Sequence, residues 1–156
     1  ARRAKHITTT AKQTHAWEFI HDEVAYNYRL PNLNAALGCA QLEQLSTKLA
    51  SKRELFRRYQ TAFSQVKGAI LVSEPAQCLS NYWLQTIMLN VGQEQHRDAI
   101  LKATNEAGLM TRPVWRLLHQ LVPFSDCPRM DLGVSESLAQ RLINIPSSPS
   151  LLSKYQ

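Results

Sequence analysis

Cysteine is scarce in this chain of 156 residues, and long apolar runs are missing. The three cysteines, Cys39, Cys78 and Cys127, are far apart and form no C-x-x-C pair, so we predict free thiols rather than a redox or zinc pair. No apolar run approaches the roughly 20 residues that span a bilayer. Residues 1–5 do not lead into the apolar core of a signal peptide. We therefore expect no membrane segment and a cytoplasmic location.

Signature motifs of several enzyme classes are also missing. There is no G-x-S-x-G elbow, Walker loop or dinucleotide-binding glycine fingerprint, so serine hydrolases, P-loop NTPases and Rossmann enzymes lack support. None of the five histidines has an H-x-x-x-H spacing or a nearby cysteine partner, and no metal site is predicted. Two interpretations of His21 stay open. Beside Asp22 and Glu23 it has the chemistry of an acid/base group, but spacing alone favours a polar surface turn.

Basic residues exceed acidic ones and give a net charge of +6, which raises the question of nucleic-acid binding. They gather only modestly, at residues 1–5 and at residues 52–58, where Glu54 lies among them. No nucleic-acid-binding motif accompanies the charge, so a solvated helix face is the better interpretation. Apolar residues make up 44% and charged residues 19% of the chain, which is typical of one globular domain.

The first part of the chain is predicted to be an arm followed by a helix. Residues 1–30 show no sustained period, and we expect an irregular arm. A long connecting helix is expected over residues 31–67, because Pro31 suits a first helical turn and Gly68 suits a helix end. Steps of three and four residues keep one side apolar except at one lysine. This seam consists of Gly38, Leu42, Leu45, Leu49, Lys52, Phe56, Tyr59 and Phe63.

The remainder, residues 68–156, is predicted to be a small α+β domain. Three strands are expected, with the second in the centre because both of its faces are apolar, at residues 70–73, 82–91 and 109–114. Two helices are expected, at residues 93–107 and from about 135–137, where Ser137 and Gln140 have capping-box spacing. The predicted fold class is therefore α+β. A long N-terminal helix leads into a small sheet of three to four strands, antiparallel or mixed, with helices on one face.

The segment from Tyr26 to Pro31 is the strongest candidate for a binding site. Asn27 and Arg29 stand just before the predicted helix start, where an amide and a guanidinium can bind the same anion. The helix N-terminus adds partial positive charge, which suits a phosphate or a carboxylate. The alternative, which local chemistry alone favours, is that Arg29 pairs with a carboxylate of its own chain while the two tyrosines pack.

Four strings of the chain resemble one known family and occur in the family's order. The string YNYRLPNLNAALGCAQLEQL resembles the helix that joins the large and small domains of DegT-type nucleotide-sugar aminotransferases. The strings SNYWLQTIML, TRPVWRLLHQL and LAQRLINIPSSPSL are similar to the small domain of that family. The arm RAKHITTTAKQTHAWEFIHDEV looks most like the branch that serves legionaminic acid and related surface sugars, near the perosamine-like enzymes.

The resemblance implies a fold-type I enzyme that uses pyridoxal phosphate (PLP) to transfer an amino group, usually from glutamate, to a nucleotide-linked keto sugar. Such enzymes are homodimers with active sites at the subunit interface. By resemblance, Asn27 would reach the cofactor phosphate of the neighbouring subunit, and Arg29 belongs to the same motif. His119 matches the histidine of the family's W-K-P-L-H run and would lie near the sugar nucleotide.

The chain differs from the family pattern at two positions and lacks one of its motifs. The family usually has glycine at the position of Ala25 and often proline at that of Leu117. Its Schiff-base lysine lies upstream of the arm, and neither Lys5 nor Lys12 matches that motif, so this chain offers no catalytic residue. Transamination needs such an amine. We therefore expect an inactive C-terminal fragment of the enzyme that binds no PLP covalently.

The alternative hypothesis is a stand-alone binding or assembly module without catalysis. A helix with one apolar side exposes more apolar surface than monomers normally carry, so we expect a homo-oligomer formed through the long helix. Binding of nucleotide or nucleic acid by the basic arm is the weakest hypothesis.

Overall fold

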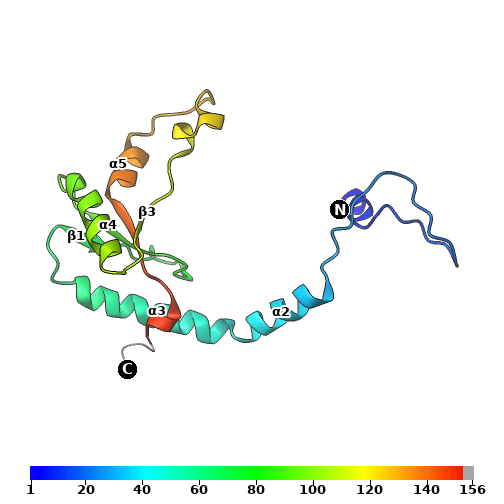
Figure 1. Ribbon diagram of the computed structural model, residues 1–156, viewed down its shortest axis with the longest axis horizontal. Helices are drawn as coiled ribbons and strands as arrows, with labels where there is room; N and C mark the ends of the chain where they lie inside the picture. The colour runs from blue at the N-terminus through cyan, green and yellow to red at the C-terminus, as the bar shows by residue number, and fades with distance from the viewer. Residues whose placement is uncertain (153–156) are drawn as a thin grey trace. The chain divides into compact units, whose positions relative to one another are not determined.

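The computed structural model describes residues 1–152 and contains two compact units, Ala1–Leu45 and Ser46–Gln156 (Figure 1). The predicted division at residues 30 and 67 differs from this boundary and stays a prediction. No described helix is both long and apolar enough to cross a lipid bilayer.

The first unit has more order than the predicted irregular arm. It begins with α1 (Arg2–Thr8), which ends where Thr8 and Thr9 turn their hydroxyl groups back onto carbonyls of the helix. Isolated antiparallel bridges then join Thr9 to Asn27 and Lys12 to His21. The backbone around Thr10 has positive φ, which no sequence pattern predicted.

The predicted long helix is divided in the structure. Residues 31–67 contain α2 (Asn32–Glu43) and α3 (Leu45–Phe63), with Gln44 between them. Gln44 has φ −95° and ψ −2°, and its N–H bonds to the carbonyl of Leu42 instead of the carbonyl four residues earlier. Neither glycine nor proline marks this position, so the sequence carries no signal for the break.

The second unit is built on a four-stranded antiparallel sheet with the order β1-β2-β4-β3. The strands are β1 (Ala69–Leu71), β2 (Gln85–Leu89), β3 (Arg112–Pro113) and β4 (Leu142–Ile145). The central position predicted for β2 is confirmed. β3 is shorter than expected, and β4 was not predicted because its apolar residues follow a helix without a turn signal.

One face of the sheet carries the core. Ile87, Leu89 and Ile143 are buried there, and Phe63 of α3 and Ile100 pack against them. Ile100 belongs to α4 (Arg97–Glu106), so α3 and α4 contribute to the same face. The predicted α+β class, with helices on one face of a small sheet, is therefore confirmed.

Further helical segments complete the unit. α5 (Gly133–Arg141) begins earlier than predicted, and the Ser137–Gln140 pair lies inside it instead of capping it. Short 3₁₀ helices are η1 (Glu94–His96), η2 (Leu118–Gln120), η3 (Val122–Phe124) and η4 (Pro149–Leu151).

Candidate functional site

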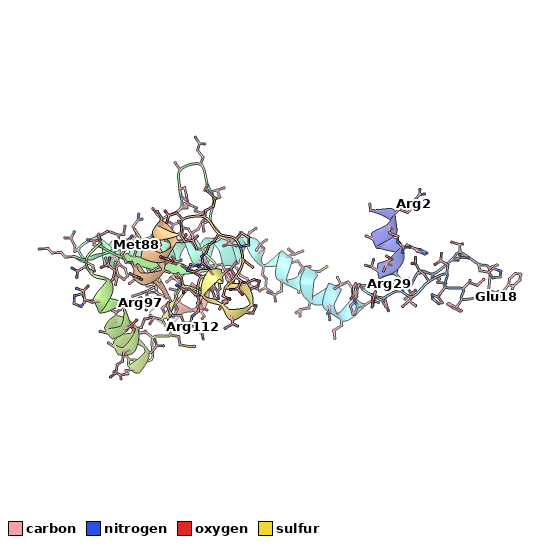
Figure 2. The ribbon with its side chains drawn as sticks, turned by 90° about the horizontal axis from the view of Figure 1, so that it is seen from above. Arg2, Glu18, Arg29, Met88, Arg97 and Arg112 are labelled. Carbon is pink, nitrogen blue, oxygen red and sulfur yellow. The ribbon has the colours of Figure 1, made fainter. Side chains whose placement is uncertain are left out.

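The segment before α2 is organised by contacts between Asn27 and Arg29. Asn27 Oδ1 accepts hydrogen bonds from the Arg29 backbone N–H at 3.3 Å and from Arg29 Nη1 at 3.5 Å. Arg29 Nη2 donates to the carbonyl of Thr9 at 3.0 Å, near the end of α1 (Figure 2). The oxygen of the Asn27 amide is therefore used inside the segment. Its Nδ2 group is the donor left for a ligand, and both side chains are exposed.

The start of α2 adds further donors. No side chain caps this helix, whose N-cap residue is Pro31, so the first-turn N–H groups have no side-chain acceptor. A helix of 12 residues carries partial positive charge at this end. Two side chains and a helix N-terminus thus lie within a few residues of one another along the chain, and their binding of an anion stays a prediction.

The alternative interpretation of this segment is half confirmed. Tyr26 and Tyr28 do pack, with stacked rings whose centroids are 5.6 Å apart. The predicted carboxylate partner of Arg29 is wrong for the described residues, since none of their carboxylates forms an ion pair with it. Its positive charge is directed to a backbone carbonyl and is not neutralised within residues 1–152.

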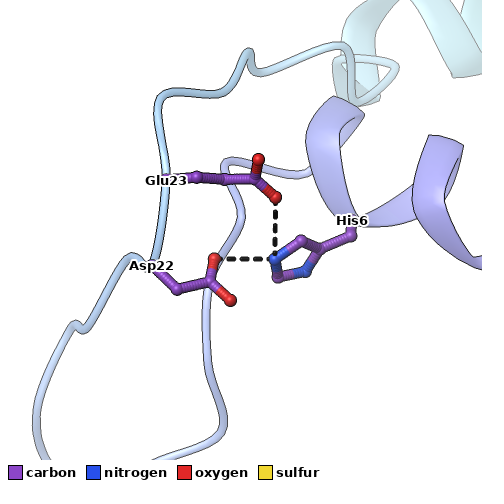
Figure 3. A group of neighbouring side chains, drawn as sticks. All are labelled: His6, Asp22 and Glu23. Carbon is purple, nitrogen blue, oxygen red and sulfur yellow. Dashed lines mark hydrogen bonds and ion pairs between the residues drawn. The ribbon is translucent and has the colours of Figure 1, made fainter.

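A second cluster in the first unit joins His6 to Asp22 and Glu23 (Figure 3). His6 Nε2 lies 2.7 Å from Asp22 Oδ1 and 3.6 Å from Glu23 Oε1, and Arg3 pairs with both oxygens of Glu23. Ligand atoms of the three side chains lie within 4.8 Å of one another, the spacing of a possible metal site. Because each carboxylate already has a partner, we interpret the cluster as an ion-pair network that ties α1 to the later chain.

The acid/base hypothesis placed His21 with the same two carboxylates, and the structure corrects it. His21 Nδ1 lies 2.6 Å from the carbonyl oxygen of Thr10. Asp22 and Glu23 instead face His6, which lies 16 residues earlier than Asp22. His21 is exposed, as the simpler interpretation of a polar surface segment expects, but it forms an antiparallel bridge with Lys12, and the chain bends only after it.

The cluster gives a testable pH effect. The pKa of Asp22 lies below its ordinary value, chiefly because His6 hydrogen-bonds to its carboxylate, with a further bond from Gln13. Such a carboxyl stabilises the fold above its unfolded pKa, and the stabilisation is lost as pH falls through the lowered folded pKa, on the acid side of about pH 4. We expect His6→Ala to raise the Asp22 pKa, as measured by NMR titration. Gln13→Ala should raise it less, and an unchanged value in His6→Ala would contradict the assignment.

His119 lies in the second unit, separate from the unit that holds Asn27 and Arg29. It belongs to η2 and lines a hollow of about 410 Å³ together with Phe124, Arg129 and other residues. His119 Nε2 is 3.1 Å from Glu136 Oε1 of α5, and the His119 side chain is 16% exposed. Glu136 is a partner that the sequence did not reveal, since it lies beyond a long loop.

Comparison with known proteins identifies the family of this chain. The profile of the DegT/DnrJ/EryC1/StrS aminotransferase family matches residues 1–156. The chain belongs to this family. Among DegT-family relatives, EpsN of Bacillus subtilis, described as a PLP-dependent aminotransferase, is 32% identical over 158 residues, which cover 99% of this chain and 40% of EpsN. GDP-perosamine synthase of Vibrio cholerae is 33% identical over 132 residues, which cover 84% of this chain and 36% of the synthase.

Solved structures agree on the fold of this DegT-family chain. PseC of Helicobacter pylori, an aminotransferase of pseudoaminic acid biosynthesis, has a TM-score of 0.84 at 16% identity, over 96% of this chain and 41% of PseC. TlmJ of Streptoalloteichus hindustanus has a TM-score of 0.81 at 21% identity, over 96% of this chain and 40% of TlmJ. The chain thus spans about two fifths of these proteins. The predicted small-domain fold is confirmed.

Proposed function

We propose that this chain is the C-terminal part of a PLP-dependent aminotransferase that moves an amino group from glutamate to a nucleotide-linked keto sugar, in the biosynthesis of bacterial surface polysaccharide. The observation that carries the proposal is the Asn27–Arg29 pair before α2 in a chain of the DegT family. The name GDP-perosamine synthase, borne by several relatives, supports a nucleotide sugar as substrate.

The residues before α2 fit the phosphate group of PLP. Asn27 offers amide donors, Arg29 offers an unneutralised positive charge, and the first-turn N–H groups of α2 follow directly. We assign to these groups the binding of the cofactor phosphate of the neighbouring subunit. When bound, PLP supplies the electron sink that transamination requires. Asn27 and Arg29 bind and orient it, and they take no part in proton transfer.

The second unit supplies the proposed contact with the sugar nucleotide. Glu136 fixes the ring of His119 through Nε2, so Nδ1 is the nitrogen that remains for a ligand. The ring is largely shielded from solvent and adjoins the 410 Å³ hollow. We assign substrate binding, and no chemical step, to His119.

α2 supports the proposed homodimer. It has no charged residue before Glu43, and none of its residues is buried within its unit. Leu33 is 81% exposed and Leu37 is 63% exposed. A helix that is apolar on most sides is normally buried, so we propose that a second subunit covers it.

The chain of 156 residues by itself is expected to show no aminotransferase activity and no covalent PLP. The reason is that Lys5 and Lys12 do not match the position of the family's Schiff-base lysine. The purified chain would be incubated with PLP, reduced with borohydride and mapped by mass spectrometry. Saturable labelling of a single lysine, lost when glutamate is added before reduction, would contradict the proposal.

The DNA sequence upstream of Ala1 tests the parent function directly. We expect the reading frame to continue upstream through a serine- and glycine-rich stretch that ends in lysine. A stop codon followed by a start codon directly before the Ala1 codon would instead favour the second candidate function, a self-associating module without catalysis.

The exposed apolar side chains of α2 favour this second candidate. Both candidate functions predict that α2 lies in a contact between copies of the chain. Light scattering is expected to show self-association of the purified chain, weakened by Leu37→Glu, because a charge in a contact between copies is costly. Asn34→Glu adds the same charge to the same helix at a polar position and should weaken association less. A wild-type chain that is monomeric at all concentrations would refute the role given to α2.

A further inference from the structure

The second unit displays two tryptophan side chains side by side. The ring centroids of Trp83 and Trp115 are 5.9 Å apart, with an angle of 34° between the ring planes. Trp83 is 64% exposed and Trp115 is 71% exposed. Large aromatic side chains usually bury most of their surface, so two neighbouring exposed indoles form an unusual aromatic surface.

The backbone around Trp83 is held in place by several contacts. Its N–H donates to Asn81 Oδ1 at 2.9 Å, and its carbonyl accepts from Ser147 Oγ at 2.7 Å and from Lys52 Nζ at 3.4 Å. The Asn81 contact is local, whereas Ser147 and Lys52 lie far from Trp83 in the sequence. The indole is therefore carried by a fixed segment and not by a free loop tip.

The residue before Trp83 adds a second sign of a constrained site. Tyr82 has φ 45°, a left-handed conformation that costs about 1–3 kcal/mol in a residue with a side chain. Its ring is buried and stacks on Phe56, with centroids 4.3 Å apart. The two adjacent aromatic side chains therefore differ in burial, since Tyr82 packs inside the unit and Trp83 is exposed.

The position of Trp115 ties this surface to the proposed substrate side. Trp115 follows β3 by two positions and precedes η2, the turn that carries His119. Arg116, its neighbour in the chain, is exposed. The exposed aromatic pair offers a ring face for a nucleobase, and an arginine next to Trp115 in the chain offers a positive charge for phosphate.

We propose that Trp83 and Trp115 form a stacking platform for the base of the nucleotide that carries the sugar. This inference rests on the proposed function for the choice of a nucleotide sugar as ligand. Every nucleobase offers a flat π-face, so the platform supplies affinity without selecting among bases by hydrogen bonds. Selection of the sugar is left to other parts of the site.

The test uses the fluorescence of the chain itself. Its third tryptophan, Trp17, lies in the other unit and is 80% exposed, so Trp17→Phe leaves Trp83 and Trp115 as the only indole reporters. We expect GDP and guanosine to quench this variant in a saturable way, and pyrophosphate and glucose 1-phosphate, which lack a base, to leave its emission unchanged. Quenching by the base-free ligands to the same extent would overturn the platform.

Substitution of either indole completes the test. In the Trp17→Phe background, Trp115→Leu is expected to weaken GDP binding by roughly fivefold to a hundredfold, the loss usual for one base–aromatic stack. Trp83→Leu should act similarly, and circular dichroism checks that both variants fold. GDP affinity by equilibrium dialysis that is unchanged in both variants, or absent from the parent chain, would overturn the platform. The proposed function would still stand or fall on the upstream reading frame.

Quenching could also arise from contact between copies of the chain. A fluorescence change that follows protein concentration in the absence of GDP, and disappears in Trp115→Leu, would assign the surface to a second copy and refute nucleotide stacking.

Discussion

Replacing Lys52 with methionine is expected to lower the free energy of unfolding of the second unit by roughly 2–4 kcal/mol. Lys52 Nζ donates to the carbonyls of Tyr82 at 3.2 Å, Trp83 at 3.4 Å and Ser147 at 2.9 Å. Lys52 is half-buried, and this burial lowers the pKa of its ammonium. Methionine has a similar length and no donor, so it would leave these carbonyls without their charged partner.

Urea unfolding followed by circular dichroism measures this effect, because the transition midpoint shifts while the slope stays the same. Lys67→Met is the matched control, since Lys67 is exposed and the same charge is removed. It should change stability by no more than about 0.5 kcal/mol. Equal effects of the two substitutions would mean that the carbonyl contacts of Lys52 contribute nothing beyond the loss of charge.

Replacing Asn27 with aspartate is expected to weaken PLP binding by roughly tenfold to a hundredfold in the enzyme that includes the upstream segment. This substitution keeps the local hydrogen bonds of the segment. An aspartate oxygen can still accept the hydrogen bonds that Arg29 gives to Asn27 Oδ1, so the local turn is retained. In the cofactor site proposed above, the amide donors would be lost and a negative charge would face the phosphate.

PLP affinity in this enzyme is measured by fluorescence titration of the cofactor-free form. Asn90→Asp makes the same chemical change in the other unit, at an exposed side chain, and should leave the affinity unchanged. An Asn27→Asp enzyme that binds PLP as tightly as the parent would remove Asn27 from the cofactor site. Weaker PLP binding in both variants would point to a general loss of stability.

The fold was predictable from sequence where a pattern repeats over several residues. The alternation in β2 and the period of α4 are such patterns, and Gly108, at φ 78°, follows the end of that helix as expected. β4 was not predicted, because strand and helix patterns cannot be told apart in a segment of four residues that follows α5 directly. The break at Gln44 was missed because no local residue preference specifies it.

In the candidate site, too, contacts between residues close in the sequence were predictable and contacts between distant residues were not. Asn27 and Arg29 are two positions apart, so their shared chemistry can be read from the sequence itself. His119 and Glu136 are 17 positions apart, and His6 and Asp22 are 16 apart, so only the folded chain shows which groups meet. Lys52 appeared in the sequence as a flaw in an apolar seam. In the structure it is the donor that three carbonyls share.

The Lys52 contacts also impose an order on the making of the protein. The last of the three carbonyls belongs to Ser147, which is added to the growing chain 95 residues after Lys52. At roughly 5–20 residues per second, the ribosome takes on the order of 5–20 s to supply it. Throughout that interval the nascent unit has an ammonium without its full set of acceptors. The full set of Lys52 contacts therefore forms only after Ser147 has been synthesised, well after α3.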